Sequence, residues 1–135
     1  MRVRYLLETN IASYVITGNI PRVRERLVAV PMSEVGISVI TEAELRYGVA
    51  RKPAARRLAE AIEEFLVRVE ILPWDSAAAK SYASLRARLE HDREAMGNLD
   101  MMIAAQALAA ELILVTHDRV FHRIKRLKIE DWTNA

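Results

Sequence analysis

Short apolar runs alternate with helical patterns from one end of the chain to the other. The runs have the length and the aliphatic or β-branched residues of strands, and they cover residues 3–7, 35–39, 69–72 and 112–115, with an edge strand expected at 127–129. Strands that alternate with helices form a parallel sheet with helices on both faces. We therefore predict an α/β protein: a three-layer α/β/α domain with a central parallel sheet of four to five strands.

The segments between these runs have helical spacing of their apolar residues. Thr41, Asp75 and Asn98 are the predicted N-caps, and Glu44, three residues after Thr41, would complete a capping box. The segment 54–68 is strongly amphipathic. The helices are predicted at 10–16, 21–29, 41–49, 54–68, 75–90 and 99–110, with a short one within 116–126.

The composition is that of one globular domain spanning residues 1–135. Hydrophobic residues make up 52% of the chain, and the length is sufficient for a hydrophobic core. No signal-peptide pattern and no apolar run of about 18 residues is present, so we expect no membrane association. The absence of cysteine excludes disulfides and thiolate metal sites, which fits a cytoplasmic protein.

Four carboxylates stand at the boundaries of the predicted elements. Glu8 follows the first strand and Asp118 the fourth, while Glu44 and Asp100 lie early in helices. Taken singly, Glu44 fits a capping box, Asp100 fits the helix dipole and Asp118 fits an ordinary turn. Glu8 is harder to explain as a structural residue, because a carboxylate buried at a strand end destabilises the fold unless something compensates it.

All four acids can converge on one edge of the sheet. The first and fourth strands have the most continuous apolar runs, so we expect them to be neighbours at its centre, and ligands of such sheets bind beyond the carboxyl ends of strands. Crowded carboxylates raise one another's pKa unless a cation neutralises them. Oxygen ligands favour Mg²⁺ or Mn²⁺. Zinc is not expected, because His91, His117 and His122 include no pair with metal-ligand spacing, and His117 is expected to be a solvated turn residue.

Five sequence blocks carry a recognisable combination. They are Tyr-Leu-Leu-Glu-Thr-Asn at 5–10, Ile-Thr-Glu-Ala-Glu-Leu-Arg-Tyr-Gly at 40–48, Gly-Asn-Leu-Asp-Met-Met-Ile-Ala-Ala at 97–105, Leu-Val-Thr-His-Asp-Arg-Val-Phe at 114–121 and Glu-Asp-Trp at 130–132. Together they resemble the PIN domain, and more narrowly a VapC-type toxin of a bacterial toxin–antitoxin pair. The resemblance runs nearly from end to end of the chain.

This resemblance implies a Mg²⁺- or Mn²⁺-dependent endoribonuclease, usually homodimeric, kept silent by a small antitoxin that covers the acidic pocket. DNA would be contacted only through the antitoxin. The catalytic acids that it implies are Glu8, Glu44, Asp100 and Asp118. The metal ligands among them would be Glu8, Asp100 and Asp118. The polar neighbours that would orient carboxylates or water are Thr9, Asn10 and Thr116.

Position 8 departs from the family pattern. The family opens with Asp-Thr-Asn, whereas this chain has Glu8, which keeps the charge but moves the carboxylate outward by one methylene. Mg²⁺ demands near-octahedral geometry, and a misplacement of about 1 Å can reduce a rate roughly 100-fold. We therefore expect the chain to bind metal but to cleave RNA slowly or not at all.

Cations near the predicted acids are candidates for contacting the RNA backbone. The run from Arg119 to Lys128, beside Asp118, is the strongest of them. Sequence-specific RNA targets usually offer single-stranded loops, so a structured RNA such as tRNA is a reasonable substrate. The candidate RNA-binding residues are Arg46, Arg86, Arg119 and Arg123.

Two other functions fit parts of this pattern. A catalytically silent subunit would dimerise and bind an antitoxin that itself binds operator DNA, with the Glu8 site supporting only metal or partner binding. A phosphoacceptor receiver domain shares the doubly wound architecture, but it needs an acidic pair after the first strand, and here Glu8 is followed by Thr9 and Asn10. Activity restored by Glu8→Asp would favour the nuclease over the silent subunit.

Overall fold

A computed structural model describes residues 2–134 of the chain. Within them lies a five-stranded parallel sheet with the strand order β3-β2-β1-β4-β5. The α/β class and the parallel sheet are therefore confirmed, and β1 and β4 are neighbours, as their apolar runs predicted. The strands are β1 (Tyr5–Leu7), β2 (Val35–Ser38), β3 (Glu70–Leu72), β4 (Ile113–Val115) and β5 (Ile129–Glu130).

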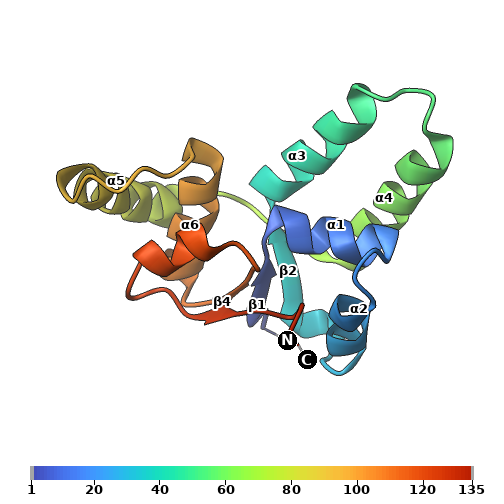
Figure 1. Cartoon of the computed structure of the whole chain (residues 1–135), viewed down its shortest axis with the longest axis horizontal. Coiled ribbons are helices and arrows are strands. Elements are labelled where there is room, and N and C mark those ends of the chain that lie inside the picture. Colours follow the sequence, from blue (N-terminus) through green and yellow to red (C-terminus); the bar gives the residue numbers. More distant parts are fainter. Residues whose placement is uncertain (1, 135) are drawn as a thin grey trace.

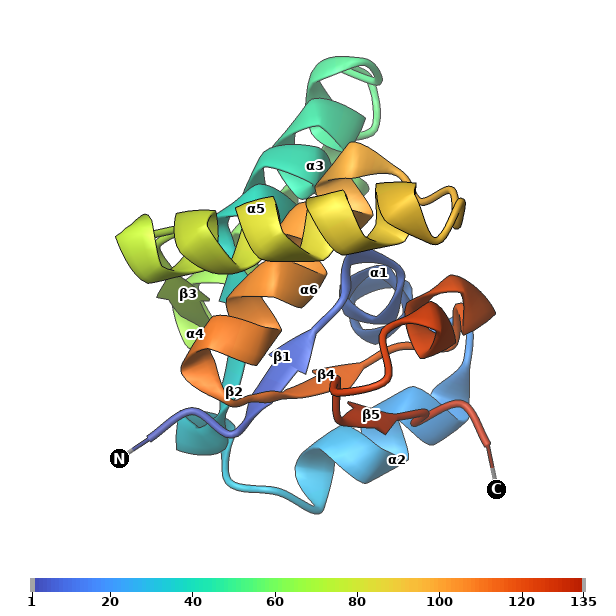
Figure 2. The ribbon, with the colours of Figure 1, turned by 90° about the vertical axis from the view of Figure 1, so that its left-hand side faces the viewer.

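Helices make the connections between the strands and cover both faces of the sheet. Figures 1 and 2 show α5 and α6 on one face and α1 to α4 on the other. No helix within residues 2–134 has the length and apolar character needed to cross a bilayer. The helices are α1 (Thr9–Thr17), α2 (Pro21–Val28), α3 (Val39–Ala50), α4 (Arg56–Arg68), α5 (Ser76–His91) and α6 (Asn98–Ala110), with 3-10 helices η1 (Met32–Glu34) and η2 (Arg119–Arg123).

The central strand β1 is buried on both faces, because successive side chains of a strand point in opposite directions. Tyr5 and Leu7 pack into one core, together with residues of α1, α2 and α4. Leu6 packs into a second core, together with residues of α5 and α6. Since Leu6 and Leu7 are both 0% exposed, the sheet is the middle layer of three, as predicted.

The start of α3 corrects a predicted N-cap. The hydroxyl of Ser38 accepts a hydrogen bond from the backbone N–H of Ile40 at 3.0 Å, so the helix begins at Val39, directly after β2. Thr41, the predicted N-cap, lies inside the first turn and is completely buried. The predicted capping box of Thr41 and Glu44 is therefore wrong, and the Glu44 carboxylate contacts a different element.

Two further boundaries differ from the predictions. Gly97 is the N-cap of α6, and Asn98 is the first residue of that helix rather than its cap. The edge strand is present but begins later than predicted, at Ile129, which pairs with β4. Leu127, predicted to start that strand, is buried in the core with α5 and α6 instead. Neither difference moves a predicted acid away from the edge where β1 and β4 end.

Candidate active site

Glu8 joins the ends of two neighbouring strands. It follows β1 directly and caps α1, where its Oε2 accepts a hydrogen bond from the backbone N–H of Asn10 at 3.1 Å. Its Oε1 accepts one at 3.3 Å from the hydroxyl of Thr116, which follows β4. Glu8 is only 3% exposed. Burial raises the pKa of Glu8 from 4.5 to about 7, against the lowering effect of the hydrogen bonds, and the charge of Asp100 raises it further.

Glu44 is held by the residue next to Glu8 in the chain. The hydroxyl of Thr9 donates a hydrogen bond to Oε1 of Glu44 at 2.6 Å, and it lies 2.9 Å from the hydroxyl of Thr41. Thr9 has a single hydroxyl proton, and it uses this proton in the hydrogen bond to Glu44. Thr41 is therefore the donor in the second contact. The sequence interpretation missed this role of Thr41. The spacing of Thr41 and Glu44 gave no signal of it, because the contact is made to Thr9 on another helix, α1.

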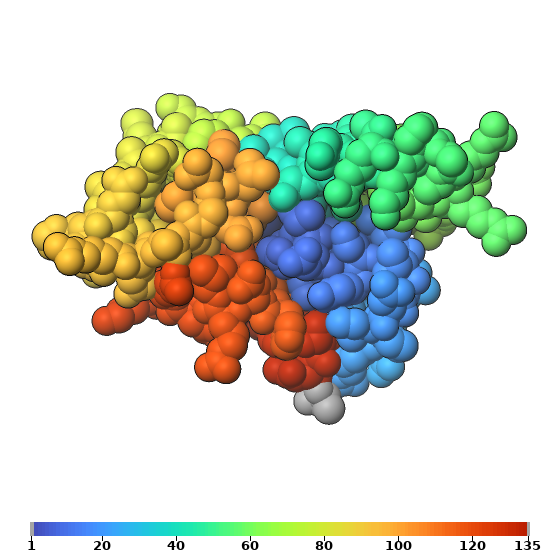
Figure 3. Space-filling view, turned by 45° about the horizontal axis from the view of Figure 1, so that its top comes forward, coloured from blue at the N-terminus to red at the C-terminus, as the bar shows by residue number. Residues whose placement is uncertain are grey.

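Asp100 lies in the first turn of α6, and its charge interacts with those of the other three acids. Burial, then the negative charges of Asp118 and Glu44, raise the pKa of Asp100. The charge of Asp100 in turn contributes to the raised pKa of Glu8. In Figure 3 the parts of the chain that carry these acids meet on one face, with α1 in blue, the start of α3 in teal and α6 in orange. The structure therefore brings the four predicted acids together around Asp100.

Two of the predicted residues turn partly away from this centre. Asp118 is exposed, and its Oδ1 accepts a hydrogen bond from the backbone N–H of Val120 at 3.0 Å, which caps η2. Asn10 contacts Glu8 through its backbone N–H, while its side chain is exposed. Among residues 2–134, no three acidic or histidine side chains are already arranged to hold a metal ion.

The chemistry of the donors nevertheless fits a hard divalent cation. Glu8, Asp100 and Asp118 offer carboxylate oxygens only, which are the ligands that Mg²⁺ and Mn²⁺ prefer. A bound cation would relieve the repulsion that raises the pKa of Asp100. The structure is thus compatible with the expected type of metal.

His117 is exposed, as predicted, but it is held in place. Its Nδ1 lies 2.8 Å from Oδ2 of Asp131 and 3.0 Å from the hydroxyl of Thr133. Burial acts to raise the pKa of Asp131, but the hydrogen bonds from Thr133 and His117 outweigh it and lower that pKa. These contacts hold the residue before Asp118 against the C-terminal turn.

Two of the predicted RNA-binding arginines already have acidic partners. Arg46 forms ion pairs with Glu42 at 2.9 Å and with Glu63 at 2.5 Å. Arg86 forms one with Glu90 at 3.0 Å. Solvent screens exposed pairs of this kind, so they do not prevent either arginine from binding RNA, and that role stays a prediction.

The other two predicted arginines lie beside an acid of the site. Arg119 and Arg123 are the first and last residues of η2, which Asp118 caps. Within residues 2–134, neither forms an ion pair. Their guanidinium charges are therefore not neutralised by a carboxylate, although the guanidinium of Arg123 donates a hydrogen bond to the backbone carbonyl of Ala95.

The comparisons with known proteins agree on one family. Residues 5–127 match the family model of the PIN domain. The chain is 35% identical over 132 residues to the tRNA(fMet)-specific endonuclease VapC of Shigella flexneri, covering 97% of this chain and 99% of that protein. It is 33% identical over 130 residues to ribonuclease VapC2 of Rickettsia felis, covering 95% and 97%.

Solved structures give the same result for the fold. The chain superposes with a TM-score of 0.90 on the crystal structure of DNA-bound VapBC from Salmonella typhimurium, with 35% identity and coverage of 96% of this chain and 98% of that one. It superposes with a TM-score of 0.88 on VapBC2 from Rickettsia felis bound to a DNA fragment from their promoter, with 33% identity and coverage of 98% and 99%.

Proposed function

Because the chain belongs to the PIN-domain family, as a VapC ribonuclease of a toxin–antitoxin system, we propose that it hydrolyses phosphodiester bonds in a transfer RNA. The Shigella flexneri relative is a tRNA(fMet)-specific endonuclease, which supports tRNA as the substrate. The observation that carries the proposal is the gathering of Glu8, Glu44 and Asp118 around Asp100, where β1 and β4 end.

The proposed cofactor is Mg²⁺ or Mn²⁺, held by Glu8, Asp100 and Asp118. When bound, such an ion would stabilise negative charge on the phosphoryl oxygens and lower the pKa of a water molecule. The oxygen-only donors and the repulsion among the acids support this assignment.

Glu44 is the proposed acceptor of the proton that the attacking water loses. Thr9 occupies Oε1 of Glu44 and Thr41 holds Thr9, so the orientation of the carboxylate is set by two hydroxyls. The second oxygen, Oε2, would then take the proton. Thr9 and Thr41 are positioning residues in this scheme, because Thr9 contacts Glu44, Thr41 contacts Thr9, and neither is given a contact with the RNA.

We further propose that Glu8, standing where the family has aspartate, slows cleavage. Its two carboxylate oxygens are engaged by Asn10 and Thr116. Because burial raises the pKa of Glu8 to about 7, part of the Glu8 population is protonated at neutral pH. Metal binding must displace this proton, and the longer side chain must also fit a geometry suited to aspartate.

The proposed protein partner is an antitoxin that covers the acidic site. A groove of about 650 Å³ runs beside Thr9 and Glu44. Tyr47 and Leu99, which are 66% and 47% exposed, line this groove and offer apolar surface to a partner. The VapBC complexes among the similar structures support such a partner. We further propose that the protein forms a homodimer, is located in the cytoplasm and contacts DNA only through the antitoxin.

A second candidate function is a catalytically silent subunit that binds an antitoxin within a DNA-binding regulatory complex. Glu8 would favour it, if a glutamate where the family has aspartate weakens the proposed metal site, and the similarity to complexes solved on DNA favours it too. A cleavage assay on tRNA(fMet) and on total RNA separates the two functions. We expect the Glu8→Asp chain to cleave RNA with Mg²⁺ or Mn²⁺ but not with a chelator, and added Asp100→Asn to abolish cleavage. A Glu8→Asp chain that cleaves no RNA would favour the silent subunit.

A further inference from the structure

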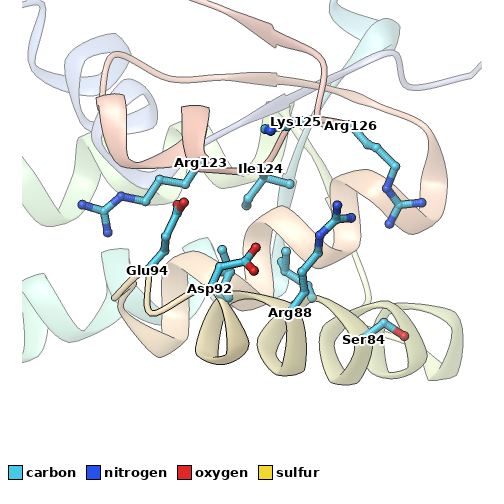
Figure 4. A pocket seen from close by; sticks show the side chains of 10 residues that line it. Ser84, Arg88, Asp92, Glu94, Arg123, Ile124, Lys125 and Arg126 are labelled. Carbon is cyan, nitrogen blue, oxygen red and sulfur yellow. The ribbon is translucent and has the colours of Figure 1, made fainter.

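A second hollow of the surface lies apart from the carboxylates, between α5 and the segment that follows η2. This pocket encloses about 220 Å³. Figure 4 shows the C-terminal half of α5 on one side and the segment around Ile124 on the other. Its charged lining residues are Arg88, Asp92, Glu94, Arg123, Lys125 and Arg126.

The cations of this pocket have no acidic partner. Within residues 2–134, none of the four takes part in an ion pair, although Asp92 and Glu94 lie in the same pocket. Arg88 and Arg126 extend into the gap from opposite walls (Figure 4). Like charges that face each other across a gap repel unless an anion lies between them. The pocket is therefore built in a way that favours an anionic ligand.

The walls of the pocket continue into the acidic site. The loop that contains Asp92 and Glu94 leads into α6 and Asp100, while η2 leads from Asp118 to Arg123. At about 2 Å per residue, the five residues of η2 span roughly 10 Å. The guanidinium of Arg123 donates to the backbone carbonyl of Ala95, which ties the two walls together. Both walls of the pocket are therefore formed by segments that lead to Asp100 and Asp118.

We propose that this pocket binds a backbone phosphate of the RNA substrate, away from the cleaved bond, with Arg88 and Arg126 as its main contacts. The inference rests on the proposed ribonuclease function. A guanidinium offers phosphate two parallel N–H donors, so two facing arginines suit a single phosphate group. Asp92 and Glu94 repel phosphate from the other end of the pocket, which restricts the ligand to the gap between Arg88 and Arg126.

The experiment measures the affinity of the full chain for fluorescent tRNA(fMet) at several salt concentrations, with a chelator present to prevent metal-dependent cleavage. Arg88→Gln/Arg126→Gln is compared with Arg56→Gln/Arg57→Gln, which removes the same charge from two exposed arginines at the start of α4. We expect the pocket variant to bind RNA roughly tenfold more weakly. The slope of log affinity against log salt concentration should be smaller in magnitude by about one to two. The control variant should change affinity less than about twofold.

A conservative variant separates the effect of guanidinium geometry on RNA affinity from the effect of positive charge. Arg88→Lys/Arg126→Lys keeps both charges but removes the paired donors, so its affinity should lie between those of the unchanged chain and the glutamine variant. Thermal unfolding verifies that every variant is folded. Equal RNA affinity of the pocket and control variants would overturn the inference, and so would a chain that binds no RNA.

Two further outcomes have distinct meanings. If the pocket variant keeps its RNA affinity but loses affinity for a polyglutamate peptide, the pocket serves an acidic protein segment and the inference is overturned. If the Glu8→Asp chain cleaves RNA while the pocket variant binds like the control, the pocket assignment fails and the proposed function stands. Failure of the Glu8→Asp chain to cleave any RNA would count against the function itself.

Discussion

Thr116 donates a hydrogen bond to Oε1 of Glu8 over 3.3 Å and accepts one from the backbone N–H of Asp118 over 3.0 Å. Thr116 and Glu8 are only 2% and 3% exposed. One buried hydroxyl therefore links the acid after β1 to the acid after β4. Because both residues are buried, the hydrogen bond contributes to stability as well as to the geometry of the site.

Replacing the hydroxyl of Thr116 should destabilise the fold at pH values at which Glu8 is charged. Thr116→Val keeps the shape of the side chain but removes the donor to Oε1 of Glu8, so we expect a loss of about 1–2 kcal/mol of unfolding free energy at pH 8. Urea denaturation measures this loss. Thr116→Ser, which retains the hydroxyl, should lose less than half as much. Equal losses in the two variants would show that the methyl group, and not the hydrogen bond, matters.

The buried carboxylate of Glu8 should make the metal-free protein less stable as pH rises. The pKa of Glu8 is 4.5 in the unfolded chain and about 7 in the fold, so the fold binds more protons between these values. Its contribution is fully present below pH 4.5 and is lost as pH rises through about 7, by up to about 3 kcal/mol. Chelator-treated protein, unfolded in urea at a series of pH values, tests this expectation.

Glu8→Gln is the control for the pH series, because glutamine cannot ionise. This variant should be more stable than the unchanged chain at pH 8 and similar to it at pH 4, both with chelator. An identical pH dependence of the two proteins would place the responsible group elsewhere.

Thr9 should matter for catalysis through Glu44. In the Glu8→Asp chain, Thr9→Val removes the hydrogen bond of 2.6 Å to Glu44. We expect the cleavage rate to fall roughly tenfold, the lower range for residues that orient an acid of a metal site. Thr9→Ser should restore most of the rate. If valine and serine at this position give the same rate, the Thr9–Glu44 contact has no positioning role.

Glu111 should tolerate glycine with a gain in stability. It ends α6 in the left-handed region, with φ 56° and ψ 44°, where a side chain is strained. Glu111→Gly should therefore raise the unfolding free energy by about 0.5–1 kcal/mol. Glu111→Ala, which keeps the strain, should bring no such gain, and an equal gain from alanine would contradict this explanation.

The three layers of the fold could be predicted from the sequence, because the periodicity of apolar residues indicates which side chains are buried. Leu6 and Leu7, from the most apolar strand, do lie on opposite faces of the central strand. The convergence of the acids also followed, since residues after adjacent parallel strands share one edge of the sheet. These features depend on local pattern and on topology alone.

The contacts within the site could not be predicted from the sequence in the same way. Thr41 was interpreted as a cap because a threonine before Glu44 fits a local rule, yet Ser38 takes that role and Thr41 contacts Thr9 on α1. Whether a hydroxyl serves its own helix or another element depends on tertiary packing. The hydrogen bond that Oδ1 of Asp118 accepts from the backbone N–H of Val120 could likewise not be predicted from the sequence.

We propose that these acids form the active site of a ribonuclease whose rate is limited by Glu8. The decisive measurement is the single-turnover rate of tRNA(fMet) cleavage with saturating Mg²⁺, for this chain and for Glu8→Asp side by side. We predict that the aspartate form cleaves roughly 100-fold faster, and that both forms lose cleavage with Asp100→Asn. Equal rates of the two forms would contradict the role given to Glu8, and cleavage that survives Asp100→Asn would contradict the site itself.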